Sequence, residues 1–162
     1  MMPKLYTYYR SSSSFRVRIA LNVKQISVEH CFINLNPEVN GQYDEAYTAI
    51  NPQGRVPFFV DEDVTLSQST AIIEYLEEKY PAIPLLPEND HQRARVRQLV
   101  NIVACDIQPL NNVAVLKKLK QQFHADQDMV NQWYADWIHS GFHAFESTLQ
   151  KSEVKGRFCH GY

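Results

Sequence analysis

The first half of the chain alternates short segments of strand composition with segments whose apolar residues recur at helical spacing. Strands are predicted where Val, Ile, Phe, Tyr and Leu concentrate, at residues 4–9, 28–35, 56–60 and 64–66. Helices are predicted from the spacing of two apolar sets, one with Val17, Ala20 and Leu21, the other with Ala71, Ile72, Tyr75 and Leu76. A short irregular helix is expected over 42–50. The order βαβα followed by ββα predicts a compact α/β domain over residues 1–82.

The composition changes after this domain. Three prolines, Pro81, Pro84 and Pro87, are typical of a linker. Asn89, with Gln92 three residues later, resembles a capping box at the start of a helix.

Only helical patterns follow the linker. Pro109 is expected to end or kink the first helix, and a second is predicted over 113–123. Asp126 or Asp128 can cap a third helix. The third helix has one apolar face, formed by Tyr134, Trp137, Ile138, Phe142, Phe145 and Leu149. These patterns predict an all-α domain over residues 88–162.

Charge and hydropathy exclude several classes of protein. The net charge of -2 gives no reason to expect nucleic acid or an anionic membrane as a partner. No stretch is apolar over the roughly 18 residues that a membrane span needs. Residues 1–9 do not resemble a secretion signal, so a cytoplasmic protein is expected.

Cysteine and histidine positions argue against a disulfide framework and a metal site. Cys31, Cys105 and Cys159 are widely spaced and odd in number, so each is expected to be a small core residue. His139 and His143 lie four residues apart, but no third ligand accompanies them. No metal is predicted.

Polar residues gather where two of the predicted helices begin. In the serine run 11–14, one hydroxyl can cap a helix while the others fill a turn. Gln68 and Ser69 begin another helix, whose N–H groups and hydroxyl can form a cap or bind an anion. Arg10 can bind a carboxylate bidentately or pair with a nearby surface acid.

Three motifs stand in order along the chain: SSSSFRVRIAL at 11–21, NPQGRVPFF at 51–59 and LSQSTAIIEYLEE at 66–78. With the proline-rich linker and the helical second half, they resemble the soluble glutathione transferase superfamily. The serine-rich turn and the segment IQPL at 107–110 resemble its zeta class. This resemblance implies an α/β thioredoxin-like N-terminal domain followed by an all-α C-terminal domain.

Two features depart from the zeta-class pattern. Such turns usually read Ser-Ser-Cys, and Ser13 stands where the cysteine would be. The turn therefore offers no protein thiol for covalent or redox chemistry. Family chains also continue for further helices after the segment 156–162, so we expect the C-terminal domain to be an incomplete part of a longer one.

The resemblance implies a glutathione site and a role for each matching residue. Ser11 would face the cofactor sulfur, with Ser12 and Ser13 in the same pocket. A helix N-terminus and a donating hydroxyl both lower a thiol pKa, which favours the nucleophilic thiolate. By the same resemblance, Gln68 and Ser69 would bind the carboxylate of the γ-glutamyl group. The backbone of Val56, which precedes a cis Pro57, would pair with the cysteinyl part of glutathione. Glutathione or substrate would be contacted by Gln42, Gln108 and Asn112. Each of the last three can equally be an ordinary surface residue.

The implied reaction is the cis–trans isomerisation of a maleyl diacid, maleylacetoacetate to fumarylacetoacetate, in tyrosine and phenylalanine breakdown. Arg10 would bind a substrate carboxylate, and the family implies a homodimer. Maleylpyruvate is an alternative substrate. Two other functions stay open: a general glutathione-conjugating transferase, which would not need Arg10, and a non-catalytic binding protein on the same scaffold.

Overall fold

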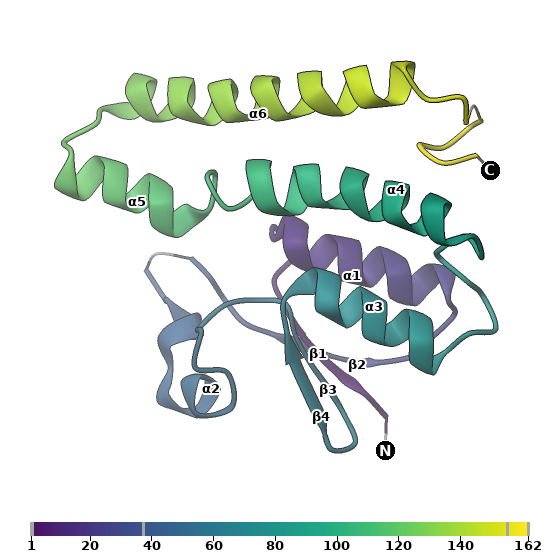
Figure 1. Cartoon of the computed structure of the whole chain (residues 1–162). Helices are drawn as coiled ribbons and strands as arrows, with labels where there is room; N and C mark the ends of the chain where they lie inside the picture. Colours follow the sequence, from purple (N-terminus) through teal and green to yellow (C-terminus); the bar gives the residue numbers. More distant parts are fainter. Residues whose placement is uncertain (1, 37, 155, 162) are drawn as a thin grey trace. The chain divides into compact units, whose positions relative to one another are not determined.

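The computed structural model describes residues 2–36, 38–154 and 156–161. The chain divides into two compact units, Met1–Leu86 and Pro87–Tyr162, each of which is described by itself (Figure 1). The first unit contains β1 (Lys4–Thr7), α1 (Ser12–Val23), β2 (Glu29–Phe32), η1 (Gly41–Tyr43), α2 (Glu45–Ile50), β3 (Phe58–Asp61), β4 (Val64–Ser67) and α3 (Ser69–Lys79).

The strands form one mixed sheet in the order β2-β1-β3-β4. β1 pairs in parallel with β2, while β3 is antiparallel to both β1 and β4. β2 is shorter than the predicted strand 28–35. β2 lies at the edge of the sheet and pairs with β1, which has four residues, so ladder pairing stops at Phe32 opposite Thr7.

Side chains that alternate along the strands cover the two faces of the sheet. Leu5 and Phe59 point to the face covered by α1 and α3, which lie side by side in Figure 1. The buried core there consists of Leu5, Val17, Ala20, Leu21, Phe59, Ile72 and Leu76. On the other face, the Tyr6 ring packs against the rings of Tyr47, from α2, and Phe58.

The helical periodicity of this unit is confirmed for α1, where Val17, Ala20 and Leu21 are buried. The predicted face of α3 is partly wrong. Ile72 and Leu76 are buried as expected, but Ala71 is exposed, and Glu77 is buried beside Leu76. A charged residue takes a core-side position because it has a buried partner at the C-cap of α1.

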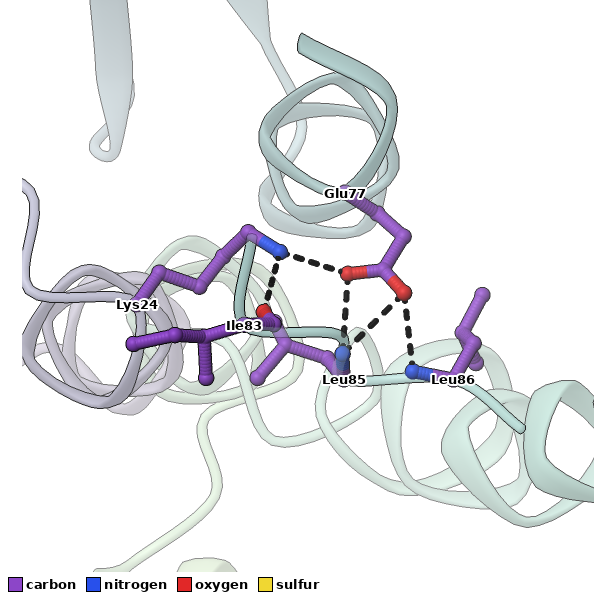
Figure 2. A network of polar contacts seen from close by, with 5 residues as sticks. All are labelled: Lys24, Glu77, Ile83, Leu85 and Leu86. Atoms are coloured by element: carbon purple, nitrogen blue, oxygen red, sulfur yellow. Dashed lines mark hydrogen bonds and ion pairs between the residues drawn. The ribbon is translucent and has the colours of Figure 1, made fainter. Parts of the chain in front are cut away.

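That partner is Lys24, at the end of α1 (Figure 2). The Lys24 ammonium donates to the Glu77 carboxylate and to the Ile83 carbonyl, both at 2.7 Å. The Glu77 carboxylate in turn accepts from the backbone N–H groups of Leu85 at 2.9 Å and Leu86 at 2.9 Å. The proline-rich segment after α3 is therefore held to the unit by one buried ion pair.

The second unit contains α4 (Asp90–Asn101), η2 (Ile102–Ile107), α5 (Val113–Gln122) and α6 (Gln127–Gln150). The Asn89 side chain accepts from the Gln92 N–H at 3.1 Å, and Asp126 from the Met129 N–H at 2.8 Å, which confirms both predicted caps. η2 is a π-helical continuation of α4 and ends two residues before Pro109, as expected.

α6 packs closely against η2 at Gly141. A Cβ atom at this position would come within 2.2 Å of the Ile107 side chain, so only glycine fits there. Two turns earlier in α6, the Trp133 indole N–H donates to the Leu110 carbonyl at 3.0 Å. The predicted apolar face of α6 is partly wrong, because Tyr134 and Phe142 are 44% and 46% exposed while Val130 is buried.

The prediction for the cysteines is also wrong in part. All three are free thiols, but Cys105 and Cys159 are exposed and Cys31 is half-buried. Cys105 lies in η2, on the side away from Ile107, which is the buried residue of that segment. Small size and apolar character did not decide their positions, because each was placed by the face that its helix, strand or loop presents.

Candidate active site

The sheet topology brings three of the motifs to one edge. Tyr6, near the end of β1, pairs with Phe58, the first residue of β3. Phe58 in turn pairs with Ser67, the last residue of β4. The turn after β1, the segment before β3 and the start of α3 therefore meet at this edge, called the serine edge below.

The serine turn connects β1 to α1. The Ser11 N–H donates to the Tyr8 carbonyl at 3.1 Å, which closes a turn over residues 8–11. The Ser11 side chain then caps α1, since its oxygen accepts from the Ser14 N–H at 3.1 Å. Because the oxygen serves as acceptor, the hydroxyl proton is still available to a ligand. The capping role and the proposed sulfur contact are thus compatible in one side chain.

The other serines differ in exposure. Ser12 is exposed and Ser13 half-buried, both in the first turn of α1. Ser14 is fully buried, and its hydroxyl has no hydrogen-bond partner among the described residues. The resemblance implied roles for Ser11, Ser12 and Ser13 and none for Ser14, and the burial of Ser14 was not predicted. Its burial follows from helical spacing, because Ser14 lies three residues before the core residue Val17.

Arg10 lies in the turn that Ser11 closes, and its side chain is exposed. Its position next to Ser11 comes directly from the turn 8–11. An exposed guanidinium beside a helix N-terminus is suited to an anionic ligand.

The start of α3 is built differently from the expected serine cap. Gln68 is the N-cap residue, and its side chain makes no capping hydrogen bond. The Ser69 hydroxyl instead accepts from the Arg16 guanidinium at 3.3 Å. Ser69 therefore does not cap α3, because it is the first residue of the helix and Gln68 holds the N-cap position. Sequence reasoning missed Arg16; the signal was a cation two residues after the serine run.

Gln68 has the backbone angles φ 73° and ψ 113°. A positive φ is costly for a residue with a Cβ atom, and such residues concentrate at functional sites. The Gln68 side chain is exposed and donates to the Gln53 side chain at 3.0 Å. This arrangement leaves the first N–H groups of α3 without a side-chain cap, as an anion site requires.

The peptide bond between Val56 and Pro57 is cis, as expected from the resemblance. Val56 is half-buried and Pro57 buried. The preceding Arg55 carbonyl accepts from the Tyr47 hydroxyl at 2.6 Å and from the Asn51 amide at 2.7 Å. Burial raises the pKa of Tyr47, so its hydroxyl stays protonated as a donor. Tyr47 and Asn51, both missed in the sequence, anchor the chain before β3.

Gln42 lies in η1, next to the segment that leads to β3. A Cβ atom at Gly54 would be 2.9 Å from the Gln42 carbonyl oxygen, and Gly54 has φ 56°, so the two backbones are in close contact. The Gln42 amide donates weakly to the Asn40 side chain at 3.5 Å. Its side-chain oxygen is buried and has no partner among the described residues.

Gln108 and Asn112 belong to the second unit, and the serine edge consists of first-unit residues only. Gln108 follows η2 and is half-buried. Asn112 caps α5, since its side-chain oxygen accepts from the Ala114 N–H at 2.9 Å. The Asn112 side-chain NH2 group is the part that could still contact a ligand.

Within the described residues, no group of three or more His, Cys, Asp or Glu side chains could hold a metal ion. No helix within these residues is long and apolar enough to cross a membrane. An open pocket of about 730 Å³ lies at the opposite end of the first unit, lined in part by Lys24, Lys79 and Tyr80. Both lysines are already paired with carboxylates, so we place the candidate site at the serine edge.

Residues 5–88 match the family model for the glutathione S-transferase N-terminal domain. The chain is 48% identical to a maleylacetoacetate isomerase of Pseudomonas aeruginosa over 90% of this chain and 69% of that protein. It is 45% identical to a zeta-class glutathione S-transferase of Euphorbia esula, over 98% and 68% of the two chains.

Solved structures give the same result. A maleylacetoacetate isomerase from Methylobacterium extorquens, with bound malonate and glutathione, superposes with a TM-score of 0.93 at 39% identity. The superposed region includes 98% of this chain and 74% of the isomerase chain. The predicted architecture, an α/β thioredoxin-like unit followed by a helical one, is confirmed. The chain belongs to the glutathione S-transferase family, and within it to the zeta class.

Proposed function

We propose that this protein is a glutathione-dependent cis–trans isomerase of maleyl diacids, and that it converts maleylacetoacetate to fumarylacetoacetate. The observation that carries the proposal is the serine turn at the amino end of α1, with Val56–Pro57 and Gln68–Ser69 at the same edge. Relatives named maleylacetoacetate isomerase, 40–48% identical, support the choice of reaction.

The polar groups of the serine edge fit glutathione. The buried Gln42 side-chain oxygen lacks a donor among the described residues, and a peptide N–H of the tripeptide would supply one. The uncapped start of α3, with the guanidinium of Arg16 at the Ser69 hydroxyl, suits a carboxylate. A peptide with a free α-carboxylate and a thiol therefore matches what this edge presents.

The serine turn would prepare the thiol for reaction. Bound glutathione would supply a thiolate that adds to the conjugated double bond, allows rotation about the resulting single bond, and leaves by elimination unchanged. The Ser11 hydroxyl would donate to the sulfur, and the amino end of α1 would add a partial positive charge. Ser12 and Ser13 would line the same pocket. The hydrogen bond from Ser11 and the partial positive charge of the helix both favour the thiolate over the thiol at neutral pH.

The remaining residues would orient the reactants. Gln68 and Ser69 would hold the γ-glutamyl carboxylate, and the Val56 backbone would pair with the cysteinyl part of the tripeptide. Gln42, Gln108 and Asn112 would contact glutathione or substrate. Arg10 would bind a carboxylate of the diacid and stabilise negative charge that develops there during the reaction.

Maleylpyruvate is a second candidate substrate. A maleylpyruvate isomerase of Ralstonia sp. is 43% identical over 98% of this chain and 74% of that protein, which favours it specifically. Both substrates are maleyl diacids, so the same roles of Ser11 and Arg10 would apply. We also propose a cytoplasmic homodimer that acts in tyrosine and phenylalanine breakdown, with domains at 1–82 and 88–162.

The decisive experiment measures isomerisation of maleylacetone and maleylpyruvate with and without glutathione. We expect turnover only with glutathione, and Ser11→Ala should lower it roughly tenfold and raise the pKa of the bound thiol. Ser27→Ala, an exposed serine of the same unit, is the matched control and should change neither quantity. Turnover that does not need glutathione would refute the proposal.

Glutathione binding without isomerisation would instead favour a conjugating transferase or a binding protein. Arg10→Met distinguishes a conjugating transferase from an isomerase, because conjugation of a halide does not need a contact with a diacid. We expect Arg10→Met to reduce diacid turnover more than conjugation of an aryl halide. Equal losses would remove the carboxylate role from Arg10.

A further inference from the structure

Arg18 lies on α1, but its guanidinium reaches back to the chain that precedes the serine turn. Nη1 donates to the Thr7 hydroxyl at 3.2 Å and to the Tyr8 carbonyl at 3.3 Å. Nη2 donates to the Tyr9 carbonyl at 3.3 Å. The guanidinium carbon also lies 5.4 Å from the centre of the Phe15 ring. One side chain therefore contacts the last residue of β1 and both residues that follow it.

The carbonyls that Arg18 contacts belong to the turn that presents Arg10 and Ser11. The Tyr8 carbonyl accepts from Arg18 and also from the Ser11 N–H, at 3.1 Å, which closes the turn. Arg18 thus ties the turn to α1, and the Ser11 cap ties it to α1 a second time at the Ser14 N–H. The position of Ser11 is therefore set both by the Arg18 contacts with the preceding carbonyls and by its own cap on α1.

The Arg18 contacts with Thr7 and Tyr8 are partly buried, and the contact with Tyr9 is exposed. Thr7 is fully buried, and Arg18 is half-buried beside the Phe15 ring. Hydrogen bonds with a charged donor are stronger than neutral ones, and reduced access of water strengthens them further. The planar fork of a guanidinium reaches separate acceptors at once, which a lysine ammonium on a flexible stem does not do with the same geometry.

We propose that Arg18 is a positioning residue, which sets the Ser11 hydroxyl and the Arg10 side chain through the backbone of the turn 8–11. This inference rests on the proposed function, in which Ser11 contacts the thiol and Arg10 the diacid. Arg18 acts on both through one turn, so its loss affects the bound thiol and diacid turnover together.

The test compares Arg18→Met and Arg18→Lys with Val17→Ala in the full chain. Val17 is fully buried on the same helix, so its truncation destabilises the unit without removing a bond to the turn. Three quantities are measured: the pKa of enzyme-bound glutathione thiol from thiolate absorbance, kcat and KM for maleylacetone, and amide hydrogen exchange at Ser11.

In Arg18→Met we expect a raised thiol pKa, kcat lower by roughly tenfold, and Ser11 exchange faster by a similar factor. Arg18→Lys should recover part of each effect, because a cation remains but the fork is lost. Val17→Ala should lower stability and leave the thiol pKa and Ser11 exchange unchanged. Unchanged thiol pKa and exchange in Arg18→Met, or equal shifts in Val17→Ala, would overturn the inference.

Failure of the proposed function would be seen separately. If the unchanged protein neither binds glutathione nor isomerises maleylacetone, the proposed function falls. Ser11 exchange still decides the positioning role in that case. Faster exchange in Arg18→Met than in Val17→Ala supports it, and equal exchange refutes it.

Discussion

The two ends of the first unit treat polar groups in opposite ways. At the end formed by the carboxyl ends of α1, β3 and α3, charged side chains are buried and paired. Lys24 and Glu77 have side chains that are 0% and 8% exposed, and the Asp61 carboxylate accepts from Tyr75, Tyr80 and Lys79. At the serine edge, by contrast, the hydroxyl of Ser14 and the side-chain oxygen of Gln42 are buried without partners among the described residues.

The difference separates polar groups that are paired within the fold from polar groups that have no partner among the described residues. Burial alone would raise the pKa of Asp61, but hydrogen bonds from Lys79, Tyr80 and Tyr75 outweigh it and hold that pKa below its ordinary value. Burial, together with the hydrogen bond to the Asp61 carboxylate, raises the pKa of Tyr80 to about 12. The donors Lys24, Lys79, Tyr75 and Tyr80 at this end all contact carboxylates of the same unit. The serine edge keeps donors, acceptors and a strained backbone that the fold itself does not need.

Removing Lys24 should give the largest effect. Lys24→Met leaves the Glu77 carboxylate buried without its cation, which we expect to cost about 3–5 kcal/mol in the free energy of unfolding. Urea denaturation measures this loss. Lys4→Met is the matched control, because the Lys4–Glu29 pair is exposed and should contribute little to stability. Similar losses in both variants would show that burial does not distinguish the two pairs.

Acidification should be next in size, and it acts on the same end of the unit. Hydrogen bonds from Lys24, Leu85 and Leu86 overcome the effect of burial and lower the pKa of Glu77. A carboxyl with a lowered pKa in the folded state stabilises the fold above its unfolded-state pKa, and this contribution disappears as the pH falls toward the folded-state value. Stability should therefore decline below about pH 4.5, the ordinary value for Glu77.

The variant Glu77→Gln should show a shallower decline over this pH range, although it starts from a lower stability. Urea midpoints at a series of pH values between neutral and acid test this. Parallel curves for the two proteins would contradict the assignment of the acid sensitivity to Glu77.

A substitution at the serine edge should have the opposite sign. Gln68→Gly relieves a positive φ at the start of α3, so we expect stability to rise by about 1 kcal/mol. Glutathione affinity should fall, because the Gln68 amide is lost. Gln53→Ala, which removes only the hydrogen-bond partner of Gln68, is the control and should not raise stability. A destabilised Gln68→Gly protein would show that the backbone angle is not a strain.

The smallest effect is expected at Ser14. Its buried hydroxyl has no partner among the described residues, so Ser14→Ala should change the free energy of unfolding by less than about 1 kcal/mol, or increase it. Thermal unfolding measures the difference. Ser11→Ala removes a cap of the same helix and should cost about 1 kcal/mol. A larger loss at Ser14 than at Ser11 would mean that the Ser14 hydroxyl is bonded, for example to a buried water.

Local patterns were sufficient to predict many of these features. The spacing of Val17, Ala20 and Leu21 predicted α1 because helical periodicity is a property of neighbouring residues. Asn89 and Asp126 were predicted as caps because a cap contacts N–H groups only three residues away. The cis bond before Pro57 came from the resemblance to a known family, since sequence composition alone gives only a weak preference for it.

Other features depend on residues far apart in the chain. Lys24 and Glu77 are separated by 53 residues, as are Arg16 and Ser69. Each looks like an ordinary polar position on a helix until α1 and α3 pack together. The contact between the Arg16 guanidinium and the Ser69 hydroxyl could not be predicted for this reason.

The sequence by itself determined the order of strands and helices, the serine turn, two of the helix caps and the family. These depend on short-range spacing, capping chemistry and motifs that stay readable in one dimension. Only the tertiary structure decided which polar groups pair and which stay available. Pairing requires side chains from α1, α3 and the strand ends to meet, and the sheet order β2-β1-β3-β4 brings them together at its two edges. The contacts of Arg18 with the serine turn are among the features that only the tertiary structure decided.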